Sequence, residues 1–192
     1  MNQIDSAIII GGDVGEVATY DCQTHELIDL WTVGVRVTAL ACLSLEEGGL
    51  VVAAGTCQGD VILRQDFEDG VPRKHTCALN SEITNIVFSG DKTLMAVASM
   101  DGHIYLLQFH MTDFFHFASC SLERDFAVNL NFSEDSSMLT MFTNRRKVMM
   151  VNVANFREFL QESEQTEEVR AKMPIYYSAQ DLQSVLWAKW KI

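Results

Sequence analysis

Few side chains in this chain have the spacing that metal chemistry requires. Structural zinc sites take cysteine and histidine ligands that come in closely spaced pairs. His103 and His110 are seven residues apart, and no two cysteines form a C-x-x-C pair. The five cysteines are Cys22, Cys42, Cys57, Cys77 and Cys120. We therefore expect no metal site and no cofactor, and we expect reduced thiols rather than a disulfide framework.

The glycine-rich segment at residues 11–15 has the composition of a nucleotide-binding turn. A dinucleotide site needs such a turn to open a helix, because the N–H groups of the helix N-terminus bind the pyrophosphate. Residues 16–21 read as a strand instead, so we predict a hairpin turn at residues 11–15. The sequence also lacks the G-x-S-x-G, H-E-x-x-H and P-loop motifs. These motifs mark several hydrolase and nucleotide-binding sites.

The composition predicts a folded, acidic protein. Of the 192 residues, 48% are hydrophobic, and 14 Lys and Arg stand against 26 Asp and Glu, for a formal net charge of -12. That charge repels nucleic-acid phosphates and anionic lipids, so neither is an expected partner. No apolar run approaches the roughly 20 residues of a membrane span, and no charged-then-apolar leader opens the chain. We expect a cytoplasmic protein without a membrane span.

Two clusters of side chains could recognise another protein. Arg145, Arg146 and Lys147 are the densest basic cluster in the acidic chain, at a predicted hairpin turn where they could contact an acidic partner. An ordinary solvated turn is the alternative interpretation. Residues 113–117 are an aromatic cluster, for which packing between sheets is the favoured interpretation.

The same turn recurs four times at nearly constant separation. Gly15, Gly59, Gly102 and Arg146 hold the equivalent position, at separations of 44, 43 and 44 residues. An apolar or small run precedes each turn and a strand-like segment follows it, which predicts a β-hairpin. Further strands flank the hairpins, so the unit has four strands. Strands are predicted before three of the hairpins, at residues 37–42, 83–88 and 127–132, and a fourth copy of this strand is predicted at residues 182–187. The strands after the hairpins are predicted at residues 27–31, 73–77 and 115–119.

Four antiparallel strands every 43 to 44 residues match one blade of a β-propeller of the WD type, whose period is about 40 to 45 residues. We therefore predict an all-β chain of about four blades. Closed propellers have typically about 4 to 8 blades, so we expect a partial propeller or a fragment, completed by missing blades or by a partner chain. The predicted units are residues 1–33, 34–78, 79–122 and 123–181, with the start of a further blade at residues 182–192.

Residues 155–172 break the rhythm of strands and predict a short helical insertion. Asn155 is of the residue type that caps a helix N-terminus, and Glu158 is three residues further on, as in a capping box. Arg170 and Lys172 would interact favourably with the dipole at the C-terminal end. An acidic solvated loop is the alternative.

Residues 95–106, MAVASMDGHIYL, resemble the signature of WD40-repeat proteins, in which small residues and Ser precede Asp-Gly and an apolar strand. The order of strand, Ser/Asp turn and strand at residues 126–153 is similar to the later blades of the echinoderm microtubule-associated protein-like family. The similarity covers residues 38–187. It implies a propeller that acts on microtubules, in the cytoskeleton or in an axoneme.

The chain departs from the WD40 pattern in two places. The Trp-Asp dipeptide is replaced in every repeat, and only the first replacement is conservative. The replacements are Tyr20-Asp21, Arg64-Gln65, Leu107-Gln108 and Val151-Asn152. The turn aspartate is clearly present only as Asp101. The fourth turn has Asn144, Arg145 and Arg146 where a glycine is expected, and Asn144 is the residue expected to permit the turn, because Asn tolerates positive φ.

A non-catalytic scaffold that binds other proteins is the predicted function, and tubulin or microtubules are the partners that the resemblance implies. The expected location is the cytoplasm, at the cytoskeleton or in a cilium. The alternative is a subunit of a trafficking, ciliary transport or ubiquitin-ligase complex. An enzyme would need a site at the channel mouth, built from carboxylates such as Asp13, Asp60 and Asp101. Their position in polar turns explains them more simply.

Overall fold

The computed structural model describes residues 7–45, 49–65, 73–79, 81–110, 113–122 and 124–153. Within these ranges every element of regular secondary structure is a β-strand, and the strands form four antiparallel sheets. The first sheet contains β1 (Ala7–Gly11), β2 (Glu16–Asp21) and β3 (Leu27–Thr32). The second contains β4 (Val37–Ser44), β5 (Leu50–Thr56), β6 (Asp60–Gln65) and β7 (Arg73–Ala78). The third contains β8 (Ile83–Phe88), β9 (Leu94–Ser99), β10 (His103–His110) and β11 (Asp113–Ser121), and the fourth contains β12 (Ala127–Phe132), β13 (Met138–Thr143) and β14 (Val148–Asn152).

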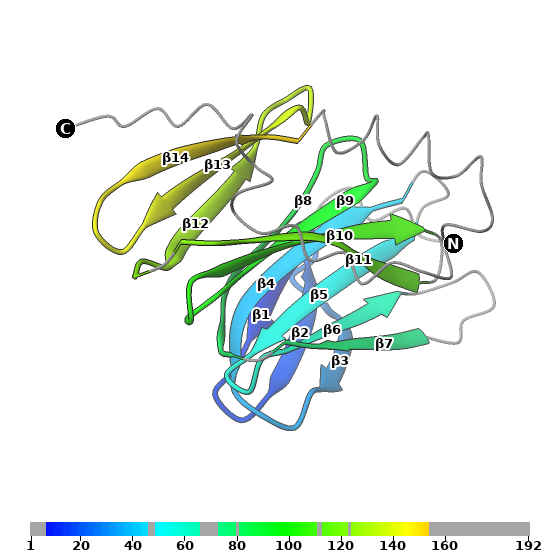
Figure 1. Cartoon of the computed structure of the whole chain (residues 1–192). Coiled ribbons are helices and arrows are strands. Elements are labelled where there is room, and N and C mark those ends of the chain that lie inside the picture. The colour runs from blue at the N-terminus through cyan, green and yellow to red at the C-terminus, as the bar shows by residue number, and fades with distance from the viewer. Residues whose placement is uncertain are drawn as a thin grey trace, which may run out of the picture.

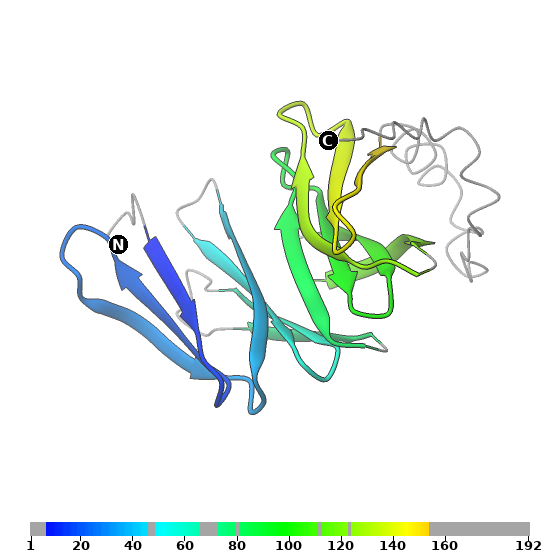
Figure 2. The ribbon, with the colours of Figure 1, turned by 90° about the vertical axis from the view of Figure 1, so that its left-hand side faces the viewer.

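The strands of each sheet follow one another in chain order, so that each sheet is a simple meander (Figure 1). The sheets lie side by side, also in chain order, and Figure 2 shows them from the blue first sheet to the yellow fourth sheet. β4, β8 and β12 contact one another in that order, and β1 contacts β4. We call β4, β8 and β12 the inner strands. Each belongs to its own sheet, so the sheets are joined mainly by side chains.

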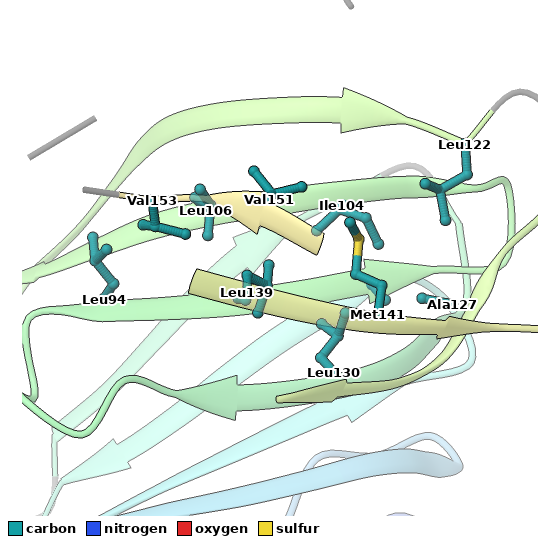
Figure 3. Close-up of a cluster of buried hydrophobic side chains, with 12 residues drawn as sticks. Leu94, Ile104, Leu106, Leu122, Ala127, Leu130, Leu139, Met141, Val151 and Val153 are labelled. Atoms are coloured by element: carbon teal, nitrogen blue, oxygen red, sulfur yellow. The ribbon is translucent and has the colours of Figure 1, made fainter. Parts of the chain in front are cut away.

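Buried apolar side chains fill the space between neighbouring sheets in three clusters. Between the third and fourth sheets, Leu94 and Ile104 pack with Leu139, Met141 and Val151 (Figure 3). Alternate residues of a strand point to opposite faces, so the second and third sheets, which have a neighbour on each side, are buried on both faces. This explains why β5 and β9 read as continuous apolar runs rather than as alternating patterns.

Small residues let neighbouring sheets approach closely. A Cβ atom on Gly55 of β5 would lie 2.5 Å from Cγ2 of Ile83 in β8. Gly11 of β1 has the equivalent contact, 2.6 Å from Cγ1 of Val37 in β4. Ala96 and Ala98 of β9 are fully buried. The small residues of these strands are therefore explained by packing.

Threonine side chains hold the inner strands in register. Oγ1 of Thr38 donates to the carbonyl of Ile83 at 2.6 Å, and Oγ1 of Thr84 donates to the carbonyl of Ala127 at the same distance. Both bonds join residues near the starts of neighbouring inner strands. The inner strands are therefore parallel to one another, and the equivalent ends of the sheets lie on the same side of the molecule.

The expected all-β architecture is confirmed, and the predicted strands agree with the observed ones to within two residues at each end. Four strands are present in the second and third sheets, and three in the described parts of the first and fourth. The predicted helical insertion at residues 155–172 and the predicted strand at residues 182–187 lie outside the described residues. So do the side chains of Cys77, Cys120 and residues 113–117.

Candidate interaction surface

The four turns that define the repeat have the same backbone conformation. Gly15, Gly59 and Gly102 have φ of 86°, 92° and 88°, and Arg146 has φ of 59°. These angles lie in the region that glycine adopts readily and that other residues adopt at a cost. The equivalence that the spacing predicted is therefore present in the geometry, including at the turn without glycine.

Backbone hydrogen bonds join each of these turns to an inner strand or to the segment that leads into one. In the last three turns, the backbone N–H groups of Cys57, Met100 and Asn144 donate to the carbonyls of residues 36, 82 and 126 at 3.1, 2.8 and 3.0 Å. In the first turn, the carbonyl of Gly12 accepts from the N–H of Val37 in β4 at 3.2 Å. Because the inner strands are parallel and in register, the four turns gather on one side of the molecule. We call this side the turn end.

A second reason for glycine appears in the first three turns. The loop behind each turn comes so close that a Cβ would collide with its backbone: on Gly59 it would lie 2.5 Å from the carbonyl O of Leu79, and on Gly102 it would overlap the carbonyl O of Asp125. Leu79 and Leu122 donate their N–H groups to the carbonyls of Gly59 and Gly102, both at 2.8 Å. Glycine is thus required there both by φ and by the close loop.

The fourth turn corrects one expectation. Arg146, not Asn144, takes the positive φ. Asn144 fixes the turn in another way, because its Oδ1 accepts from the N–H of Phe126 at 3.1 Å while its own N–H donates to the carbonyl of Phe126 at 3.0 Å. Its side chain thereby ties the turn to the start of β12.

The basic cluster of this turn is divided between two roles. Nζ of Lys147 donates to Oδ2 of Asp125 at 2.6 Å, and Nε of Arg145 lies 3.0 Å from Oδ1 of the same carboxylate. The Asp125 side chain is only 5% exposed, whereas those of Arg145 and Lys147 are 57% and 51% exposed. Two of the three cations therefore neutralise a buried carboxylate. Arg146 is exposed, and in the described part of the chain no ion pair engages it.

Arg124 adds a cation that sequence analysis missed. It is exposed, next in the chain to Asp125. Asp125 contacts residues 145 and 147 across about twenty positions, so no local pattern could have joined Arg124 to the cluster. We call Arg124, Arg145, Arg146 and Lys147 the basic patch. With Asp125 it carries a formal net charge of three positive units in a chain of net charge -12.

The other turns at this end have different charges. The turn of the first sheet has exposed Asp13 and Glu16. Between the second and third sheets, Arg36 and Glu82 form an ion pair at 3.1 Å. The turn end therefore grades from acidic at the first sheet to basic at the fourth.

The carboxylates considered for catalysis belong to three different sheets. Asp13 lies in the β1–β2 turn, Asp60 begins β6 and Asp101 lies in the β9–β10 turn. Partial burial alone would raise the pKa of Asp101, but hydrogen bonds from Ser99 Oγ and the N–H of His103 outweigh it and lower the pKa below its usual value. Asp101 is thus engaged in fixing its turn. Among the described residues, no three His, Cys, Asp or Glu side chains form a group suited to a metal ion.

Comparisons with known proteins show the fold. No family model matches the chain, and no curated protein matches it. The structure is similar to that of Sqt1 from Chaetomium thermophilum, a WD40 protein, with a TM-score of 0.65 at 14% sequence identity. The match covers 78% of this chain and 41% of the Sqt1 chain, so this chain spans less than half of that protein's length.

The architecture is therefore WD40-like. It is also common, because 1082 chains of solved structures match, and a shared fold does not fix a function. No helix among the described residues is long and apolar enough to cross a membrane.

Proposed function

We propose that the chain is a non-catalytic WD40-like scaffold that binds an acidic segment of a protein partner at the basic patch. The observation that carries this proposal is the division within the patch: Arg145 and Lys147 are held in place by Asp125, while Arg146 and Arg124 project from the same turn end into solvent. The held pair fixes the turn, so the free guanidinium groups start from an ordered backbone. Guanidinium groups suit this role because they bind carboxylates through two parallel hydrogen bonds.

Fluorescence anisotropy with a labelled glutamate-rich peptide tests the proposal. We expect the Arg124→Ala, Arg146→Ala double variant to bind up to about thirtyfold more weakly, because each exposed charge pair contributes up to about 1 kcal/mol. Binding should also weaken as salt is added.

Lys92→Ala is the matched control. Lys92 is also a cation at positive φ, 63°, but it lies in the β8–β9 turn at the opposite end of the sheets. Its removal should leave the affinity unchanged. Equal binding by the native chain and the double variant would contradict the proposal.

Microtubules are the acidic partner implied by the family that the sequence resembles, and the proposed location is the cytoplasm, at the cytoskeleton or in a cilium. Cosedimentation with polymerised microtubules tests this narrower proposal. We expect pelleting at low salt that decreases in the Arg124→Ala, Arg146→Ala variant and not in Lys92→Ala. Absence of pelleting at low salt, together with retained peptide binding, would exclude microtubules and keep the acidic-segment proposal.

A further inference from the structure

The first sheet exposes an apolar face on its outer side. Ile8, Ile10 and Leu30 are 49%, 54% and 55% exposed. They share one face, because Ile10 pairs with Ala18 and Ala18 pairs with Leu30, while Ile8 lies two residues from Ile10 on the same strand. The opposite face of the sheet packs on the second sheet through Val17 and Trp31.

The equivalent positions in the next sheet are buried. One repeat later, 44 residues on, Ile8, Ile10 and Ala18 correspond to Val52, Ala54 and Ile62, which are 5%, 0% and 4% exposed. Those three residues form the contact with the preceding sheet. The bare face of the first sheet is therefore a sheet-to-sheet contact surface without its neighbour.

The fourth sheet exposes the complementary face. Phe142 is 42% exposed, and Val148 pairs with it across the sheet. One repeat earlier, the equivalent residues are Ala98 and Ile104, which are 0% and 2% exposed and pack against the following sheet. Val128 extends this open face at the inner strand, with 48% exposure, in the position where Thr38 and Thr84 reach the next inner strand.

We propose that a second copy of this chain covers both faces, with the fourth sheet of each copy packed on the first sheet of the other. The two faces are the two halves of the contact that already joins neighbouring sheets inside the chain, and they lie at opposite ends of the row of sheets (Figure 2). Two copies of four sheets make a ring of eight. That number lies within the range of about 4 to 8 seen in closed propellers.

The match to Sqt1 agrees with a ring of two copies. The matched part of this chain superposes on 41% of a WD40 chain. The matched part of this chain therefore corresponds to rather less than half of such a protein, which leaves length for a second set of four sheets.

Charge favours this head-to-tail arrangement over a pairing of two first sheets. Head-to-tail packing brings the basic turn of one fourth sheet, with Arg146, to the same side as the acidic turn of the other first sheet, with Asp13 and Glu16. Two first sheets placed face to face with their turn ends on the same side would bring two acidic turns together. Repulsion between like charges opposes that pairing.

Sedimentation of the full chain tests the proposal. We expect a species of twice the 21.6 kDa chain mass. Ile10→Asp and Phe142→Asp should each reduce it to the mass of one chain, because each puts a charge into both contacts of the ring. Met100→Asp is the matched control. Met100 is 49% exposed and lies in a turn of the third sheet, away from both open faces. The Met100→Asp variant should therefore still form the dimer. Circular dichroism of each variant checks that it is folded.

Mixing the two variants separates head-to-tail packing from other dimers. A mixture of Ile10→Asp and Phe142→Asp chains can form one contact between two unsubstituted faces, so a mixed dimer should reappear. If Ile10→Asp loses the dimer while Phe142→Asp keeps it, the dimer holds two first sheets face to face, and the proposal is overturned. A monomer at all concentrations would overturn it, and so would filaments, which form when a head-to-tail contact does not close. The substituted residues Ile10 and Phe142 lie outside the basic patch, so a failure of peptide binding does not by itself decide the sedimentation result.

Discussion

Between the second and third sheets, Val51, Ala53 and Ile83 are fully buried, whereas Ile8 and Ile10 on the outer face of the first sheet are about half exposed. β1 and β5 have similar apolar sequences and the same position in the repeat, and Ile83 belongs to β8, the inner strand that packs against β5. The difference comes from the number of neighbours: a middle sheet is covered on both faces and an end sheet on one. In repeat architectures, stability is largely a sum over such contacts, so we infer that the middle of the molecule holds the fold and the ends are available for association.

The contact between the first and second sheets also differs in kind from the contact in the middle. The guanidinium of Arg64 donates to Oδ1 of Asp29 at 2.9 Å and lies 5.8 Å from the ring centre of Trp31. The contact between the second and third sheets consists mainly of aliphatic side chains. The first sheet is therefore attached partly by a half-buried ion pair and an aromatic ring, which give less stability than a tightly packed aliphatic layer.

The largest effect should come from matched leucine truncations in the middle and at the end. Leu107 is fully buried between the second and third sheets, and Leu30 is 55% exposed. In the Phe142→Asp background, where association is expected to be absent, Leu107→Ala should lower the free energy of unfolding by about 2 to 5 kcal/mol, because it leaves a cavity. Leu30→Ala should change it by less than about 0.5 kcal/mol. Urea denaturation measures both, and equal losses would contradict the comparison.

A glycine substitution distinguishes the third turn from the fourth. Gly102→Ala should lower the free energy of unfolding by about 2 kcal/mol or more, since alanine is strained at φ of 88° and its Cβ meets the carbonyl of Asp125. Arg146→Ala replaces one residue with a Cβ by another at the same positive φ, so the backbone strain does not change. It should lower the free energy of unfolding by less than about 0.5 kcal/mol. Thermal denaturation followed by circular dichroism checks the pair. A stable Gly102→Ala variant would show that the loop behind the turn is not close.

Gly55 and Gly12 make a similar pair between the middle and the end. Gly55→Ala should cost about 1 to 3 kcal/mol, because its Cβ would press against Ile83. Gly12→Ala meets only the carbonyl of Glu16 at 3.8 Å, so it should change the stability by about 0.5 kcal/mol or less. The order of the two urea midpoints tests the close approach of β5 and β8.

The smallest effect concerns Asp135 and is visible only through its pH dependence. Hydrogen bonds from Ser133 Oγ, at 2.6 Å, and from Ser137 lower the pKa of Asp135 from 3.8 to about 2. Because the pKa of the folded state is lowered, this carboxylate stabilises the fold above about pH 4, and its contribution is lost as the pH falls toward 2. Asp135→Asn should therefore lower Tm slightly at pH 7 and not at pH 2.

Glu134→Gln is the control for this measurement. Glu134 is an exposed carboxylate next to Asp135 that makes none of the turn's hydrogen bonds described here. Its Tm difference from the native chain should be close to zero at both pH values. A Tm difference for Asp135→Asn that does not change with pH would contradict the assignment.

The repeat could be predicted from the sequence because its signals are local. A glycine followed by a strand-like segment marks a hairpin, and this pattern at Gly15, Gly59 and Gly102 gave the period and the strands. Spacing alone aligns Arg146 with the three glycines. It does not assign the positive φ to Arg146, because Arg at positive φ is uncommon and Asn, as at position 144, adopts it more often.

The open faces and the division of the basic patch could not be predicted in this way. Ile10 and Ala54 hold the same position in the repeat, and only the presence of a neighbouring sheet makes one exposed and the other buried. The pairing of Asp125 with Lys147 joins two loops 22 residues apart. Such contacts depend on how the sheets stack, which residue types and spacing do not specify.

Hydrogen exchange in the Ile10→Asp variant, which we expect to be monomeric, tests most directly that neighbouring sheets stabilise one another. We predict that the amides of β5, β8 and β9 exchange most slowly and those of β1 and β3 fastest, since a sheet covered on both faces opens least often. Protection of the first sheet equal to that of the second would contradict the account.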